Sequence, residues 1–219
     1  MKRPLIQWLG LSGLLALLSY TAAVVISPSA YPGYDWMAQA VSDLSAQSAP
    51  SRMLWQQLAA FYDIGSVVSA TCVSIYISET KAGSRLFRLG MHLFTIMMWV
   101  SAVGYQMFPL ADGGKEIASF AEVMHIAVTA AVVLLSIVSL VILMLAAVKK
   151  HELRPVGIAA AIASAMMLVG AVGQGLVPSR YFGIVERFSV FAAVGFNAVN
   201  GLYMFNGFAG LPQLKSYEK

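Results

Sequence analysis

Residues 119 to 147 read SFAEVMHIAVTAAVVLLSIVSLVILMLAA, and this stretch decides the fold class. Its apolar part exceeds the roughly 20 residues that an α-helix needs to cross the hydrocarbon core of a bilayer. It also lacks the alternation of polar and apolar residues that is typical of a membrane β-barrel strand. We therefore expect it to form one membrane-spanning helix.

The composition extends this expectation to the whole chain. Of its 219 residues, 59% are hydrophobic and only 11% are charged, and the mean hydropathy is +0.75, far outside the soluble globular range. The predicted fold class is all-α, a polytopic membrane protein in which residues 1–219 form one integral domain, a bundle of six transmembrane helices. The six apolar runs cover about 5–26, 54–78, 86–108, 119–147, 155–177 and 188–209.

The first run has a second interpretation. The basic MKR before it and the small residues at 27–30 after it are also typical of a secretory signal, whose removal would leave five spans. Its apolar part is longer than the usual core of a signal, which favours a retained helix.

The basic residues predict the orientation of the bundle. If the N-terminus is cytoplasmic, ten of the fourteen Lys and Arg residues lie on the cytoplasmic side, where membrane proteins collect them. Both termini are then cytoplasmic, and because the sequence has no organellar targeting segment, the simplest location is a prokaryotic inner membrane. The net charge of +4 comes largely from these residues, so we expect membrane lipids, and no nucleic acid, as partners.

The polar stretch between the first two runs, residues 34–50, reads YDWMAQAVSDLSAQSAP. Apolar residues recur from Met37 to Leu44 with helical spacing, and Asp35 precedes them as a possible N-cap. The pattern predicts a short amphipathic interfacial helix over about 36–44 on the outer side. Such a helix either seals the bundle or forms a lid over an outer cavity.

Polar residues inside the spans are costly in lipid and are candidates for a site. Asp63 lies near the middle of the second run with small residues on its face, and Asn197 lies at a similar depth in the last run. We expect the two side chains to be close. They form either part of a binding site or a neutral, hydrogen-bonded structural pair.

The run at 119–147 carries a polar stripe along one helical face. Glu122 and His125 in this stripe are one helical turn apart, which is the spacing of carboxylate–histidine metal sites in helical bundles. A two-metal site needs a second such pair, and the sequence contains none. Whether a metal is bound stays open at this stage.

Other candidate residues gather on the predicted outer side: Gln106, Asp112, Gln174, Glu186 and Arg187. An adjacent Glu–Arg pair at an interface can also be simple snorkelling. The different depths of His92 and His125 argue against a haem between them, and the lone Cys72 excludes an internal disulfide. The sequence has no phosphate-binding glycine loop and no nucleophile elbow, so the cofactor is unknown.

Several of these motifs together resemble a known family. They are YDWMAQAVSDLSAQSAP, the GYQMFPLADGG end of the third run, the early histidine of the fourth and the ER that opens the last. They are similar to the six-helix membrane proteins catalogued as domain of unknown function 998, over nearly the whole chain. The resemblance implies a six-helix fold without an established activity and marks these positions: Ser42, Asp43, Leu44, Phe108, Pro109, Asp112, His125, Glu186 and Arg187.

The first functional hypothesis is an outward-facing polar pocket that binds or senses a lipid headgroup or a small amphiphile. The pocket lies among the second, third, fourth and sixth runs, with the 36–44 helix above it and Arg187 holding an anionic group. The ligand-binding residues of this hypothesis are Ser42, Asp63, Gln106, Glu186, Arg187 and Asn197.

The alternative hypothesis is an intramembrane hydrolase or transferase that acts on lipid, with or without a metal. His125 would be the general base, and the residues that orient it or bind the metal would be Asp43, Asp112 and Glu122. A proton-coupled carrier that uses Asp63 is a third hypothesis. It is disfavoured because the sequence shows no clear inverted repeat.

Overall fold

The computed structural model describes residues 3–111 and 119–211. Within these ranges there is no strand, and six helical segments are long and apolar enough to cross a membrane, so the prediction of an all-α, six-helix membrane protein is confirmed. The helices are α1 (Leu5–Leu9), α2 (Leu11–Ile26), α3 (Arg52–Glu79), α4 (Arg85–Met107), α5 (Phe120–Lys149), α6 (Arg154–Gly173) and α7 (Phe182–Phe205).

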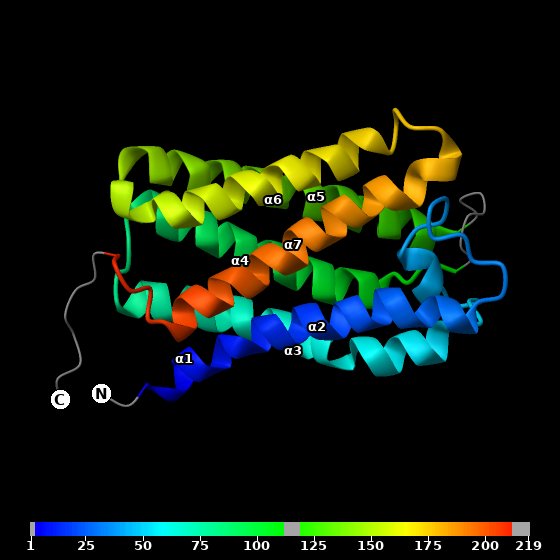
Figure 1. The fold of residues 1–219 in the computed structure, drawn as a ribbon, viewed down its shortest axis with the longest axis horizontal. Helices are drawn as coiled ribbons and strands as arrows, with labels where there is room; N and C mark the ends of the chain where they lie inside the picture. The colour runs from blue at the N-terminus through cyan, green and yellow to red at the C-terminus, as the bar shows by residue number, and fades with distance from the viewer. Residues whose placement is uncertain (1–2, 112–118, 212–219) are drawn as a thin grey trace.

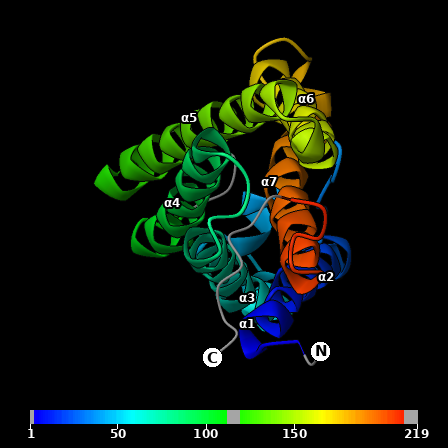
Figure 2. The ribbon, with the colours of Figure 1, turned by 90° about the vertical axis from the view of Figure 1, so that its left-hand side faces the viewer.

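The spans form a ring in chain order (Figures 1 and 2). Each helix from α2 to α6 packs against the next, α7 closes the ring against α2, and α3 also contacts α7. We call the end of the ring with residues 27–51 and 174–181 the loop end, and the opposite end the terminal end. Helices α1 and α7 meet at the terminal end, where the Trp8 and Phe205 ring centroids are 5.1 Å apart.

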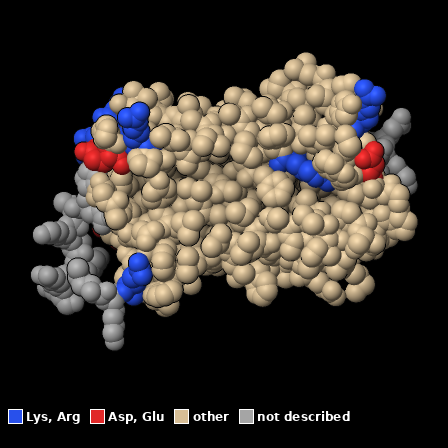
Figure 3. Space-filling view, in the orientation of Figure 1, with Lys and Arg blue, Asp and Glu red and all other residues tan. Residues whose placement is uncertain are grey.

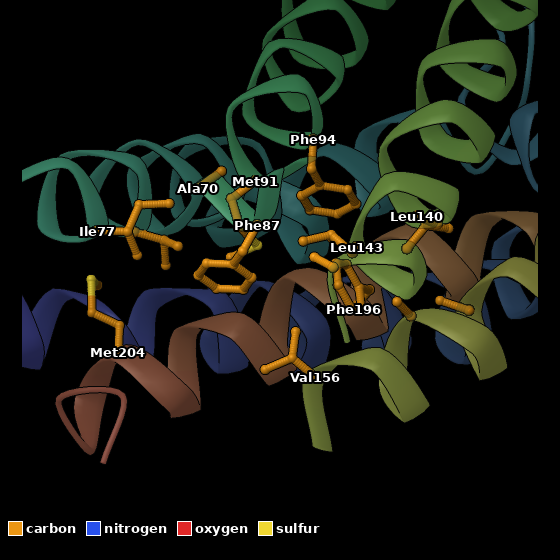
Figure 4. Packing of buried hydrophobic residues seen from close by; sticks show 14 of the residues in the cluster. Ala70, Ile77, Phe87, Met91, Phe94, Leu140, Leu143, Val156, Phe196 and Met204 are labelled. Atoms are coloured by element: carbon orange, nitrogen blue, oxygen red, sulfur yellow. The ribbon is translucent and has the colours of Figure 1, made fainter. Parts of the chain in front are cut away.

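Large apolar side chains fill the centre of the ring, as Figure 4 shows. Phe94 of α4 meets Phe196 of α7 edge to face, with 5.0 Å between the ring centroids. Helices α3 and α5 to α7 supply further buried residues around this pair, among them Ile77, Leu140, Val156 and Met204. Since lipid is as apolar as these side chains, close packing holds the helices together here more than burial from water does.

The positions of the charged side chains also fit a membrane-spanning bundle. On the face shown in Figure 3 most of them lie near the two ends of the molecule, one basic side chain lies further inward, and an uncharged band remains between the two groups. The exposed side chains of α2, α5 and α6 include large aliphatic residues, among them Leu18, Leu134, Leu145, Ile158 and Ile162. A lipid-facing surface has this composition.

The ends of the helices follow local sequence signals in part. α5 begins with a capping box, in which the Ser119 side chain accepts from the Glu122 N–H and the Glu122 carboxylate accepts from the Ser119 N–H.

The last span differs from the prediction of 188–209, because α7 begins at Phe182. Glu186 and Arg187 therefore lie within its second turn instead of before it.

The interfacial α-helix predicted over 36–44 is replaced by turns and a 3-10 helix at Ser42–Ser45. Side chains from α7 and Tyr34 bond the backbone groups that a local helix would have paired. Gln39 O accepts from Arg187, Ala40 O from Tyr34, and the Val41 N–H donates to Glu186. Long-range contacts thus overrode the amphipathic pattern.

Two glycines bring α7 into close contact with the junction of α1 and α2. A Cβ added to Gly201 would collide with the carbonyl oxygen of Gly10, and a Cβ added to Gly10 would collide with that of Gly201. This approach leaves no room for any side chain, and the backbone of neither helix can retreat without unpacking its neighbours. The residue type at 201 is therefore set by tertiary packing.

We expect Gly201→Ala to destabilise the protein by about 1–3 kcal/mol, the usual cost of overpacking. The measurement is the melting temperature of the purified protein in a mild detergent. Gly195→Ala on the same helix is the matched control, since a Cβ there meets nothing within 4 Å and Ala favours the helix. A Gly201→Ala protein as stable as the control would contradict the close contact.

Candidate functional site

A loop segment closes the loop end of the ring, and we call residues 34–51 the plug (Figure 1). Much of it is buried, and the Leu44 side chain is 0% exposed. The Ser51 hydroxyl donates to Leu44 O at 2.8 Å. The N–H groups of Gln47 and Ser48 donate to Leu110 O and Ala111 O, just beyond α4. The plug is therefore an ordered, hydrogen-bonded cover.

Arg187 on α7 holds the first part of the plug. Its Nη1 donates to Gln39 O at 3.2 Å and to Gly183 O at 2.6 Å, and its Nη2 donates to the Tyr34 hydroxyl at 2.8 Å. Its guanidinium also lies 6.0 Å from the centroid of the Trp36 ring. The planar fork of an arginine suits such a set of acceptors. The predicted alternative of simple snorkelling does not describe this side chain.

Glu186 holds the next residues of the plug. Its Oε2 accepts from the Val41 N–H at 2.9 Å, while Asp43 Oδ2 accepts from the Ala40 N–H at 3.1 Å. Ser42 lies between Val41 and Asp43 in the chain and is the first residue of the short 3-10 helix. Three residues marked by the family resemblance, Asp43, Glu186 and Arg187, thus meet around a few backbone groups of the plug.

Tyr34 completes this network and was missing from the sequence-based site. Its hydroxyl accepts from Arg187 and donates to Ala40 O at 2.7 Å. Burial raises the pKa of Tyr34 to about 12, against the opposing charge and hydrogen bond of Arg187. The hydroxyl therefore keeps its proton at neutral pH and can donate. In the sequence Tyr34 is an aromatic residue beside Asp35, and no local pattern indicates its distant partner Arg187.

Asp43 is buried in the plug. Burial raises the pKa of its carboxyl above the ordinary value of 3.8, while the hydrogen bond from Ala40 and the charge of Arg187 act in the opposite direction. An ionised carboxylate at this position therefore costs folding free energy that a neutral side chain would not.

Three tyrosines lie below the plug. The rings of Tyr20 on α2 and Tyr62 on α3 are 4.6 Å apart, and Tyr20 packs in one apolar cluster with Val41 of the plug. Tyr105 of α4 is the third, and its ring lies beside that of His125. The plug therefore packs on a tyrosine of the ring through Val41.

His125 lies at the edge of this region and contacts the end of α4. Its Nδ1 is 2.8 Å from Phe108 O, and since a carbonyl oxygen only accepts, Nδ1 carries the proton. Its ring centroid is 4.9 Å from that of Tyr105, whose hydroxyl donates to Thr129. These contacts position His125, and only Nε2 remains for acid–base chemistry.

Two of the three acidic residues expected around His125 form hydrogen bonds with backbone groups near them in the chain. Glu122 belongs to the capping box of α5, Asp43 bonds within the plug, and Asp112 lies outside the described residues. In the part of the chain that the structure describes, no three His, Cys, Asp or Glu side chains come together in a way that could hold a metal ion.

Asp63 and Gln106 line an open groove of about 390 Å³ between α3 and α4, on the side of the ring. The other lining residues are mostly apolar: Ile64, Val67, Trp99, Ala102, Val103 and Met107. The expected contact between Asp63 and Asn197 is wrong. Asp63 is exposed at the edge of the buried face of α3, whereas Asn197 is buried and donates to Ser66 O at 3.1 Å.

We expect Arg187→Lys to loosen the plug, because an ammonium cannot reproduce the bonds of the guanidinium fork. Hydrogen bonds to charged groups are worth about 1.5–3 kcal/mol, so exchange of the amides at 40–42 should become about tenfold faster or more. Hydrogen exchange followed by mass spectrometry measures this. Arg180→Lys, whose side chain lies over Tyr181, is the control, and equal exchange in both variants would count against the network.

We expect Asp43→Asn to stabilise the protein at pH 7, since Asn can still accept from Ala40 without a buried charge. The pKa of Asp43 is raised in the folded state, so the wild type loses this penalty as the pH falls through that pKa. The difference in melting temperature should therefore shrink toward pH about 4, the ordinary carboxyl range. A difference that does not change with pH would show that the charge of Asp43 is not its cause.

Comparison with known proteins identifies the family of this chain. A family model described as "Protein of unknown function (DUF998)" matches residues 14–202, which include the plug, the groove and most of α7. No curated protein and no solved structure matches the chain. Because the match covers most of the sequence, this six-helix membrane protein belongs to the DUF998 family of proteins of unknown function.

Proposed function

We propose that the protein binds a membrane amphiphile with an amine or hydroxyl head in the groove between α3 and α4. The observation that carries the proposal is Asp63. Its carboxyl group is exposed in a groove of about 390 Å³ with largely apolar walls, and it forms no hydrogen bond or ion pair with any described residue. An acidic side chain inside a membrane span normally marks a site.

The neighbouring polar side chains of α3 and α4 behave differently. Trp99 Nε1 donates to Thr71 Oγ1 at 3.0 Å, Thr95 Oγ1 donates to Ala70 O at 3.0 Å, and Ser74 Oγ is 2.6 Å from His92 Nδ1. These bonds join the two helices and satisfy the polar groups involved. The lack of such a bond at Asp63 therefore needs an explanation that the helix pair itself does not supply.

The groove matches the chemistry of an amphiphile. The oxygens of Asp63 can accept from an ammonium or hydroxyl group, and Gln106 can both donate and accept. An alkyl chain can lie against Trp99, Val103 and Met107, whose side chains are exposed. Because the groove opens on the side of the ring, such a ligand can enter from the lipid.

The contacts within the plug argue against the binding of an anionic headgroup at Arg187. Both terminal nitrogens of Arg187 already donate to groups of the protein. An anion there would have to compete with Gln39 O, Gly183 O and the Tyr34 hydroxyl. We therefore assign the amphiphile to the lateral groove, with Asp63 and Gln106 as the polar contacts.

We also infer that the terminal end faces the cytoplasm of a prokaryotic inner membrane. In the described residues the terminal end carries the larger set of basic side chains: Arg3, Lys81, Arg85, Arg88, Lys149, Lys150 and Arg154. The loop end has Arg52, Arg180 and Arg187. Basic residues favour the cytoplasmic side of membrane proteins.

A variant with Trp99 as its only tryptophan (Trp8, Trp36 and Trp55 changed to Phe) tests the binding. We expect dodecylamine and dodecanol to shift the Trp99 emission saturably, and dodecanoate to bind more weakly because of its charge. Asp63→Leu should lower the affinity for dodecylamine about tenfold or more, as expected for the loss of a charged hydrogen bond.

Two further variants sharpen this experiment. Asp63→Asn should retain dodecanol and lose most of the affinity for dodecylamine, because the amide accepts a hydrogen bond without a charge. Asp35→Asn changes an acidic residue outside the groove and is the control. Equal affinity of the Asp63→Leu variant and the control for dodecylamine would refute the proposal.

A further inference from the structure

The junction of α2, α3 and α7 contains a group of buried polar atoms that the groove and the plug do not involve. Ser69, Asn197 and Asn200 are at most 1% exposed. Ser69 Oγ, Asn197 Oδ1 and both amide atoms of Asn200 have no hydrogen-bond partner among the described residues. Buried polar atoms are rarely left in this state.

Two glycines bring Ser69 of α3 against α2 and α7. A Cβ on Gly13 of α2 would lie 2.6 Å from Ser69 Oγ and 3.1 Å from Asn197 O, and a Cβ on Gly201 of α7 would lie 2.9 Å from Ser69 Oγ. Ser69 thus contacts both neighbouring helices. Asn197 and Asn200 are one turn apart on α7, and Asn197 is tied to α3 through Ser66 O.

The position makes unbonded polar atoms costly. Ser69 lies toward the middle of the 28-residue α3, so bulk water does not reach it across the membrane. The backbone groups around it are paired within their own helices. An unsatisfied group at this depth loses its hydration without any compensating bond.

The mixture of atoms indicates the kind of ligand. Ser69 Oγ, Asn197 Oδ1 and Asn200 Oδ1 can accept, whereas Asn200 Nδ2 can only donate. A cation would bond the oxygens and leave the Asn200 Nδ2 unpaired, and hard cations usually recruit carboxylates. A water molecule donates and accepts, and buried waters typically bridge two to four such groups.

We propose that Ser69, Asn197 and Asn200 form a buried site for ordered water between α2, α3 and α7. The water bridges the two helices that meet at Ser69 and supplies the partners that the amide of Asn200 lacks. The site is independent of the amphiphile groove, because its three residues are buried and none of them lines the groove that holds Asp63.

The first test uses Asn200→Leu in the full chain, purified in a mild detergent. Leucine has nearly the shape of asparagine, so it displaces the water and also leaves Ser69 and Asn197 without their shared partner. We expect the melting temperature to fall by several degrees. A rise would overturn the proposal, because it would mean that the substitution merely removed two unbonded polar atoms.

Two companion variants control this test. Asn200→Ser leaves space for an additional water, so its melting temperature should fall less than that of Asn200→Leu. Asn206→Leu changes an exposed asparagine at the end of the same helix and should have little effect. A larger fall for Asn200→Ser than for Asn200→Leu would contradict a water-filled site.

Direct observation completes the experiment. A crystallographic or electron-microscopy map that resolves ordered water should show density within hydrogen-bonding distance of the Asn200 amide. A map with the amide bonded to protein groups and no density beside it would overturn the proposal. A melting temperature that is higher in sodium chloride than in choline chloride of equal concentration would assign the site to a cation and also overturn it.

Discussion

Every polar group that this chain carries into the bilayer needs a partner inside the protein, because lipid supplies none. Helices meet this requirement for the backbone of the spans. The plug has little regular structure and meets it through α7, where Arg187 and Glu186 bond Gln39 O and the Val41 N–H. No described residue bonds the polar side-chain atoms of Asp63 and Asn200, so a ligand or a water molecule would have to supply their partners.

The same requirement separates two regions of the molecule. At the loop end, Leu44 and Ser51 anchor a closed cover, and its polar groups are used by the protein itself. Between α3 and α4, the packing leaves a groove that opens toward the lipid. An amphiphile that enters from the bilayer would therefore not need the plug to open, and the family motif residues Glu186 and Arg187 would serve to keep the loop end closed.

Much of the fold could be predicted, and much less of the site. The six spans followed from the length of the apolar runs, since membrane thickness sets that length. The sequence marks the pair Glu186–Arg187, but their partners in the plug, the Val41 N–H and Gln39 O, lie 145 and 148 residues away in the chain. Glu122 is three residues after Ser119, which is the spacing of a capping box, and three before His125, which is the spacing of a metal pair; the structure shows the capping box.

The sequence by itself determined that the chain is an all-α membrane protein of six spans, because hydrophobic length and helix formation are local properties. Only the tertiary structure decided that the plug is not an α-helix, that Asn197 bonds Ser66 O instead of Asp63, and that Asp63 lies in a lateral groove. Each of these depends on the rotation of one helix against another. That rotation is set by close contacts such as Gly10 with Gly201, which no single helix encodes.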